Sequence, residues 1–133
     1  MDPIFSHRLE VRFRDCDPMG HVNNSVYLTC LEQARFAHWR SVRGFGRRGA
    51  PGVFLARAEI DFRRPVRYGD LLEIRIGVAA VGRTSFTYEY EIADEDGNIV
   101  ATATSVLVMY DYAVGRPVPI PEELRALLTG GRR

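Results

Sequence analysis

One stretch of helical periodicity stands among five strand-like stretches, and this arrangement constrains the fold more than any other feature. Residues 24–42 place Val26, Cys30, Ala34 and Ala37 near one stripe, a spacing typical of an amphipathic helix. In four of the other stretches apolar and polar side chains alternate, which is the period of a half-buried strand. The last stretch, residues 99–112, is apolar on both faces, so we expect a central strand or one covered by a partner. The strands are predicted at residues 4–13, 53–66, 72–78, 86–92 and 99–112.

The order of these elements is one strand, one long helix and four further strands, which predicts an α+β fold with a mostly antiparallel, five-stranded sheet. A short C-terminal helix should open at Pro121, with Glu122 and Glu123 in its first turn. One helix cannot cover five strands, so we expect a second copy of the chain to cover the rest. No repeat or linker divides the sequence, and residues 1–133 are expected to form a single domain.

The composition excludes several classes of protein. Eighteen Arg, no Lys and seventeen Asp or Glu give a formal net charge of +1, whereas a dedicated nucleic-acid-binding domain is usually strongly basic. No apolar run approaches the ~18 residues of a membrane span, and residues 1–4 show no signal-peptide pattern. Cys16 and Cys30 fit neither a CxxC nor a zinc pattern, so we expect a cytoplasmic protein with reduced thiols and no metal.

The densest polar cluster lies directly before the long helix. It contains two carboxylates, one imidazole and two amides within ten residues: Asp15, Asp17, His21, Asn23 and Asn24. A helix N-terminus offers unpaired N–H groups to a carbonyl oxygen that develops negative charge. A carboxylate beside it could act as a nucleophile or as a general base for water. From the residues alone, an active site and an ordinary cluster of turn and cap residues are equally well supported.

This cluster also carries a resemblance to a known family. Residues 15–28 (DCDPMGHVNNSVYL), followed by Glu32-Gln33-Ala34-Arg35, resemble the hotdog-fold thioesterases, and more closely their 4-hydroxybenzoyl-CoA thioesterase and YbgC-like branch. Residues 82–86 and 116–123 also resemble this branch, so the similarity covers essentially the whole chain. The resemblance implies a long central helix wrapped by a curved antiparallel sheet. It also implies a homodimer with joined sheets and interfacial active sites, or a dimer of such dimers.

The resemblance further implies an acyl-CoA thioesterase, which hydrolyses a thioester to a free carboxylic acid and CoA. The catalytic carboxylate of the family falls on Asp17, and the backbone N–H that polarises the carbonyl falls near Asn24. His21, Asn23, Asn24 and Tyr27 are candidates for substrate binding, although capping and core packing explain the same residue types. No metal or bound cofactor is expected, because CoA arrives as part of the acyl-CoA substrate.

Other residues near the motif are alternatives for catalysis. Glu32 lies about two turns into the helix, where other hotdog thioesterases carry their carboxylate, but it could equally form a structural ion pair. Asp15 is expected to cap the turn or to pair with an Arg. Cys16 stands between two carboxylates, which disfavour its reactive thiolate, and Cys30 is expected in the core.

Arginines dominate the middle of the chain and suggest where the phosphates of CoA bind. Residues 35–67 contain nine Arg and two acids, and a guanidinium binds phosphate through two parallel hydrogen bonds. A solvated surface explains the same charge run. The candidates for phosphate binding are Arg63, Arg64, Arg67 and Arg83.

Two other functions share this architecture. A hotdog hydratase or dehydratase would also use an Asp and a His, but its motif has Asn at the position of Asp17 and no Gly before the His. A non-catalytic domain that binds acyl-CoA or acyl carrier protein would not need the carboxylate of Asp17. The acyl group stays open, since six aromatic residues could line a pocket or form the core: Phe5, Phe13, Tyr27, Trp39, Phe54 and Phe62.

Overall fold

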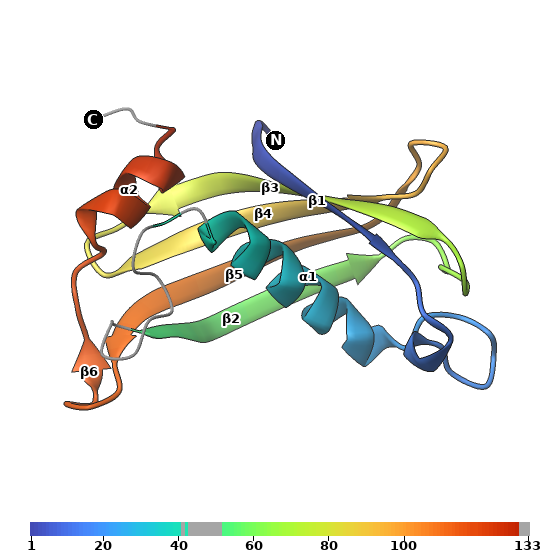
Figure 1. Ribbon diagram of the computed structural model, residues 1–133, viewed down its shortest axis with the longest axis horizontal. Coiled ribbons are helices and arrows are strands. Elements are labelled where there is room, and N and C mark those ends of the chain that lie inside the picture. Colours follow the sequence, from blue (N-terminus) through green and yellow to red (C-terminus); the bar gives the residue numbers. More distant parts are fainter. Residues whose placement is uncertain (41, 43–51, 131–133) are drawn as a thin grey trace.

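An antiparallel sheet with the long helix α1 across one face forms the body of the molecule (Figure 1). The computed structural model describes residues 1–40, 42 and 52–130. The strands are β1 (Pro3–Glu10), β2 (Gly52–Phe62), β3 (Leu71–Val81), β4 (Ser85–Ala93), β5 (Ile99–Asp111) and β6 (Arg116–Pro117). The helices are the 3-10 helix η1 (Phe13–Asp15), α1 (Asn24–Trp39) and α2 (Glu122–Leu128). This architecture confirms the predicted α+β class.

The strand order is β1-β3-β4-β5-β2, and the short β6 pairs with the end of β5. Strand β5 lies between β4 and β2, as expected for a strand that is apolar on both faces. The sixth strand was not predicted, because Pro117 suggested a break. Proline is tolerated there because β6 lies at the margin of the sheet, beside Tyr110 and Asp111.

The first strand ends three residues earlier than predicted. The carboxylate of Asp15 accepts a hydrogen bond from the backbone N–H of Arg12 at 2.9 Å and pairs with its guanidinium at 2.8 Å. These contacts fold residues 13–15 into the η1 turn. Phe13, which the alternation placed on the apolar face of a strand, is consequently 79% exposed.

The second strand and the long helix also end before their predicted limits. Strand β2 ends at Phe62, where the N–H groups of Arg63 and Arg64 both donate to the carbonyl of Val100 and Pro65 has no N–H to continue the ladder. Helix α1 ends at Trp39 rather than at residue 42. The sequence favours Arg43 in the last turn of this helix and Gly44 directly after it, but both lie outside the described residues.

The core lies between α1 and the inner face of the sheet. The helix buries Tyr27, Cys30, Leu31, Ala34 and Trp39, while the predicted stripe members Val26 and Ala37 are only half-buried. The sheet contributes alternate residues of β3, β4 and β5: Leu72, Ile74, Ile76, Phe86, Tyr88, Tyr90, Ile92, Leu107 and Met109. Among the described helices, none is long and apolar enough to cross a membrane.

Buried hydroxyl groups tie α1 to the sheet. The hydroxyl of Tyr88 accepts a hydrogen bond from Trp39 Nε1 at 2.7 Å and lies 3.0 Å from His38 Nδ1. One turn earlier, Arg35 Nη1 donates to the hydroxyl of Tyr90 at 3.3 Å, and this hydroxyl also bonds to Ser105. These buried hydrogen bonds favour one relative position of helix and strands, because a shift would break them; Arg35 Nε is the one buried side-chain N or O atom of the described residues that has no hydrogen-bond partner.

The burial of His38 predicts a pH dependence of stability. Burial lowers the pKa of His38 to about 4 from an ordinary value of 6.5. The unfolded chain therefore binds this proton at a higher pH than the folded chain does, and the unfolded state is favoured as the imidazole takes up a proton. The free energy of unfolding should be highest above pH 6.5 and should fall as the pH is lowered toward 4.

Urea titrations of the wild type and of His38→Gln at several pH values between 7 and 4 would measure this dependence. The variant should show a shallower fall, because it lacks the titrating imidazole. Parallel pH dependences in the two proteins would contradict this role of His38.

Candidate active site

The loop before α1 is a tight hairpin that fixes the carboxylate of Asp17. The Asp17 N–H donates to the carbonyl of His21 at 2.8 Å, and the Gly20 N–H donates to the carbonyl of Asp17 at 2.9 Å. Gly20 has a φ of 83°, a conformation that glycine adopts without strain. Asp17 Oδ1 accepts the N–H of Met19 at 2.9 Å and that of His21 at 3.4 Å. Asp17 Oδ2 accepts no hydrogen bond from the described residues, so it is available to a substrate or to water.

Asp17 lines a cavity of about 280 Å³. The loop and the start of α1 form one wall, and the end of β2 with the residues that follow it forms the other. The lining residues are Asp17, His21, Val22, Asn24, Tyr27, Phe62, Arg63, Arg64 and Pro65. The structure therefore brings together most of the site residues expected from the sequence.

The first N–H groups of α1 differ in whether they are already bonded. Asn23 is the N-cap, and its side chain accepts the N–H of Ser25 at 3.1 Å. The N–H of Val26 donates to the carbonyl of Asn23 at 2.9 Å. The N–H of Asn24 has no acceptor among the described residues, and Asn24 lines the cavity. This N–H, at the positive end of the helix dipole, can stabilise a carbonyl oxygen that gains negative charge.

Tyr27 and Phe62 form an aromatic wall of the cavity. Their rings meet edge to face, with centroids 4.9 Å apart at 74°. Burial raises the pKa of Tyr27, so its phenol stays neutral near pH 7. The other aromatic candidates lie elsewhere: Phe5 and Trp39 pack against the core, and Phe13 and Phe54 are exposed.

The remaining acidic residues of the motif do not face the cavity. Asp15 is buried in its contacts with Arg12, as expected for a turn cap, and the hydrogen bond from the Arg12 side chain lowers the pKa of the Asp15 carboxyl. Glu32 is exposed and does not line the cavity. Within the described residues it forms no ion pair either, so the structural role considered for it is not found. Asp17 is thus the carboxylate that the fold places at the start of α1.

The candidate phosphate-binding arginines are divided between the two ends of the sheet. Arg63 and Arg64 line the cavity, and Arg67 is joined to His21 by a backbone bridge. Arg83 lies in the turn between β3 and β4, where its carbonyl accepts the N–H of Ile120 at 2.9 Å. Because this turn is at the opposite end of the strands, Arg83 does not reach the cavity of its own chain.

Sequence reasoning missed two lining residues. Val22 and Pro65 meet in the cavity because the Val22 N–H donates to the carbonyl of Val66 at 2.7 Å, which joins the motif loop to the segment after β2. No feature of the sequence indicates this pairing. Likewise, the side chain of Asn23, expected to bind substrate, is not among the lining residues, because it caps the helix.

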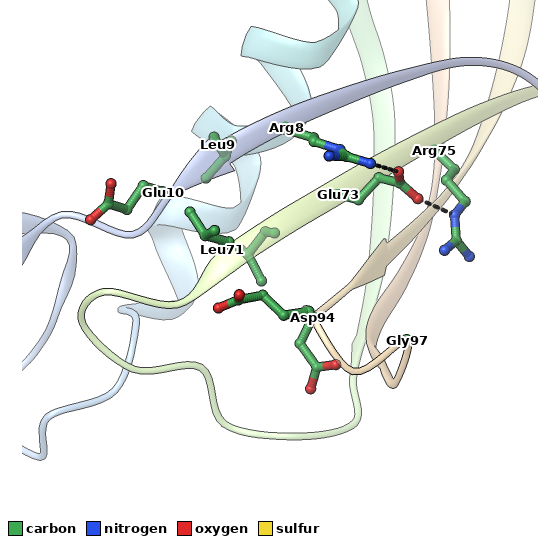
Figure 2. A pocket seen from close by; sticks show the side chains of 10 residues that line it. Arg8, Leu9, Glu10, Leu71, Glu73, Arg75, Asp94 and Gly97 are labelled. Carbon is green, nitrogen blue, oxygen red and sulfur yellow. Dashed lines mark hydrogen bonds and ion pairs between the residues drawn. The ribbon is translucent and has the colours of Figure 1, made fainter.

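A larger cavity, of about 590 Å³, lies beside β1, β3 and the turn between β4 and β5 (Figure 2). Figure 2 shows Glu73 between two arginines, with 3.7 Å to Arg8 Nη2 and 2.6 Å to Arg75 Nε. These charges are therefore already paired, and none of the motif residues reaches this cavity. Among the described residues, no group of three or more His, Cys, Asp or Glu could hold a metal ion. Size alone does not make the larger cavity a better candidate for the chemistry.

Comparisons with known proteins bear on the family and on the class of enzyme. Residues 11–128 match the family model described as the thioesterase-like superfamily. The chain is 30% identical over 120 residues to a 1,4-dihydroxy-2-naphthoyl-CoA hydrolase of Synechococcus elongatus, covering 86% of this chain and 88% of the relative. It is 27% identical over 124 residues to the long-chain acyl-CoA thioesterase FadM of Escherichia coli, covering 91% and 94%. A Thermus thermophilus thioesterase, solved with coenzyme A and zinc, has a TM-score of 0.84 and 34% identity over 98% of this chain and 97% of its own.

The fold, the loop at the start of the helix and these relatives define a hotdog-fold thioester hydrolase. The chain belongs to the thioesterase-like superfamily. The family resemblance, the fold and the enzyme class predicted from the sequence are thereby confirmed.

Proposed function

We propose that the protein is an acyl-CoA thioesterase that hydrolyses its substrate with Asp17 as the catalytic carboxylate. The observation that carries the proposal is a single cavity lined both by Asp17, whose Oδ2 accepts no hydrogen bond from the described residues, and by Asn24, whose backbone N–H has no acceptor among them. The names of two relatives, a hydrolase of 1,4-dihydroxy-2-naphthoyl-CoA and a long-chain acyl-CoA thioesterase, support a CoA thioester as substrate. The Thermus thermophilus thioesterase was solved with CoA.

The arrangement supports a simple hydrolysis. The thioester oxygen would accept the N–H of Asn24, so that negative charge developing on it lies at the positive end of α1. Asp17 Oδ2 would then take a proton from an attacking water, or attack the carbonyl carbon itself and form an anhydride that water opens. In either case the carbon–sulfur bond breaks, the CoA thiolate leaves and the acyl group gains the oxygen of water.

The other lining residues would hold the substrate. Tyr27 and Phe62 offer an apolar wall for the acyl group. His21 donates its backbone N–H to Asp17 Oδ1, and this hydrogen bond orients the carboxylate. Arg63 and Arg64 would bind the phosphates of CoA. A role for Arg83 at these phosphates would require the partner subunit, because Arg83 lies at the other end of its own sheet.

Replacing Arg63 or Arg64 with Gln should therefore raise KM for acyl-CoA roughly tenfold or more with little change in kcat, since a hydrogen bond to a charged group contributes about 1.5–3 kcal/mol. Initial rates against acyl-CoA concentration would show this. Arg116→Gln, which removes an exposed guanidinium from β6, is the matched control and should keep the wild-type KM. Equal KM values in all of these proteins would place the phosphates elsewhere.

A homodimer is part of the proposal. Strand β2 is the last strand in the order of the sheet, so its outer edge pairs with no other strand within the described part of the chain. Phe54, Leu55 and Phe62 on β2 are exposed, as are Leu28 and Phe36 on α1. Such an apolar edge invites pairing with a second copy. Sedimentation equilibrium that gives the mass of one chain would contradict the dimer.

The experiment that tests the activity is thiol release by the purified protein from a panel of thioesters. Benzoyl-, 4-hydroxybenzoyl-, phenylacetyl-, acetyl-, hexanoyl- and palmitoyl-CoA separate aromatic from aliphatic and short from long acyl groups. Release from at least one of them is expected, and the rates rank the acyl classes. No release from the folded protein, together with hydration of an enoyl-CoA, would instead support a hotdog hydratase.

A further inference from the structure

Two large aromatic side chains beside the site are exposed to solvent and contact each other. Phe13 of η1 is 79% exposed, and Tyr68, in the loop between β2 and β3, is 64% exposed. Their ring centroids are 5.9 Å apart at 84°, so one ring presents its edge to the face of the other. Water is an unfavourable environment for apolar surface of this size, and exposed apolar patches commonly mark binding sites.

The backbone holds the two rings in place. The Gly69 N–H donates to the carbonyl of Val11 at 3.1 Å, and the Val11 N–H donates to the carbonyl of Asp70 at 2.9 Å. On the other side, the carbonyl of Phe13 accepts the N–H of Cys16 at 3.2 Å. Both rings therefore project from loops that are hydrogen-bonded at their bases. A surface arranged in this way loses little conformational entropy when a ligand binds.

The pair lies close to the catalytic loop. Phe13 precedes Asp17 by four residues, which span at most about 14 Å of extended chain. Tyr68 directly follows Arg67, which forms a backbone bridge with His21 of the loop. The small cavity cannot enclose the whole of CoA, so a substrate with its thioester at Asp17 must extend over the surface outside it, and CoA is long enough to reach the pair.

An arginine adjoins each ring along the chain. Arg14 is next to Phe13 and Arg67 is next to Tyr68, and both arginines are exposed. Neither forms an ion pair with any described residue. A flat aromatic group that carries phosphates could stack on the rings and pair with the arginines at the same time. A purely apolar ligand could contact only the rings. The adenine end of CoA, with its phosphates, has this combination.

We propose that Phe13 and Tyr68 form a stacking site for the adenine ring of the CoA substrate, with Arg14 and Arg67 beside its phosphates. The proposal rests on the proposed function, because it assumes a CoA thioester at Asp17. It assigns a binding role to an aromatic pair outside the catalytic cavity, and it predicts that the enzyme distinguishes CoA thioesters from thioesters that lack the nucleotide.

The test compares one acyl group on two carriers, CoA and pantetheine, the second of which lacks the adenine and its phosphates. For Phe13→Leu and Tyr68→Leu, KM for the CoA thioester should rise roughly 5- to 150-fold, the range expected for the loss of base stacking. Their kcat should stay near the wild-type value, and their kinetics with the pantetheine thioester should not change. Tyr112→Leu is the matched control, since Tyr112 is 62% exposed and packs edge to face on Tyr110.

Each alternative has its own outcome. Unchanged KM for the CoA thioester in both variants would overturn the proposal. Equal losses with both carriers, or a change of oligomeric state in sedimentation, would also overturn it and assign the pair to folding or subunit contact. The same acyl group on acyl carrier protein serves as a third substrate. If the two variants lose activity toward this substrate alone, the pair is assigned to protein docking instead. If the wild type hydrolyses neither thioester, the proposed function fails as well, and this result is distinct from the others.

Discussion

Replacing Asp17 with Asn is expected to lower kcat at least about 100-fold, the lower end of the effect of a positioned acid or base. The amide is nearly the same shape as the carboxylate, and its oxygen can still accept the N–H groups of Met19 and His21 that hold the turn. It cannot take a proton from water or attack a carbonyl carbon. Steady-state rates of thiol release would measure the loss, and circular dichroism would check that the fold is retained.

A matched control is available in the turn between β4 and β5. Asp94 Oδ1 also accepts two backbone N–H groups, from Asp96 at 3.0 Å and from Asn98 at 2.9 Å, so its local role resembles that of Asp17. Asp94→Asn should keep the wild-type kcat, because this turn lies outside the cavity that Asp17 lines. Near wild-type turnover in Asp17→Asn, or an equal loss in both variants, would remove Asp17 from the chemistry.

The second large effect is expected on stability. Tyr88 is fully buried, at 0% exposure, and packs against Phe86, Tyr90 and Trp39 in the centre of the core. Tyr88→Ala should lower the free energy of unfolding by about 3–5 kcal/mol, the usual cost of removing a buried aromatic ring. Tyr88→Phe should cost about 1–3 kcal/mol, because it keeps the ring and removes the buried hydroxyl to which Trp39 Nε1 donates.

Urea denaturation of the three proteins gives these values, provided that each unfolds in one transition. Tyr112→Ala, on an exposed side chain, should change stability far less than Tyr88→Ala. If Tyr88→Ala were as stable as the wild type, the packing described between α1 and β4 would be wrong. If Tyr88→Phe cost as much as Tyr88→Ala, the hydroxyl contacts rather than the ring would dominate.

The periodic parts of the chain could be predicted from the sequence, and their ends could not. Alternation in β3 and β4 reports which face is buried, and β5 is a nearly continuous apolar run, so these strands were found within a few residues. The end of β1 depends on the pairing of Asp15 with Arg12, which curls the chain into η1. A pattern of apolar residues contains no information on such a side-chain contact, and Phe13 was consequently assigned to the wrong environment.

The residues of the candidate site also divide into those that the sequence predicts to be close together and those that only the fold brings together. Asp17, His21, Asn24 and Tyr27 lie within eleven consecutive residues of one loop and helix, so a local motif predicts that they are near one another. The opposite wall comes from the end of β2, which meets the loop only through tertiary hydrogen bonding. Charge alone grouped Arg83 with the arginines of that wall, but the sheet places it at the far end.

The most direct test of the central claim is a crystal structure of the protein with an acyl-CoA analogue in which a methylene group between the carbonyl and the sulfur prevents hydrolysis. The ketone oxygen should lie within hydrogen-bonding distance of the Asn24 N–H, and Asp17 Oδ2 should face the carbonyl carbon directly or through one water. An analogue whose carbonyl group lies elsewhere, for example in the cavity beside β1 and β3, would contradict the assignment of the active site.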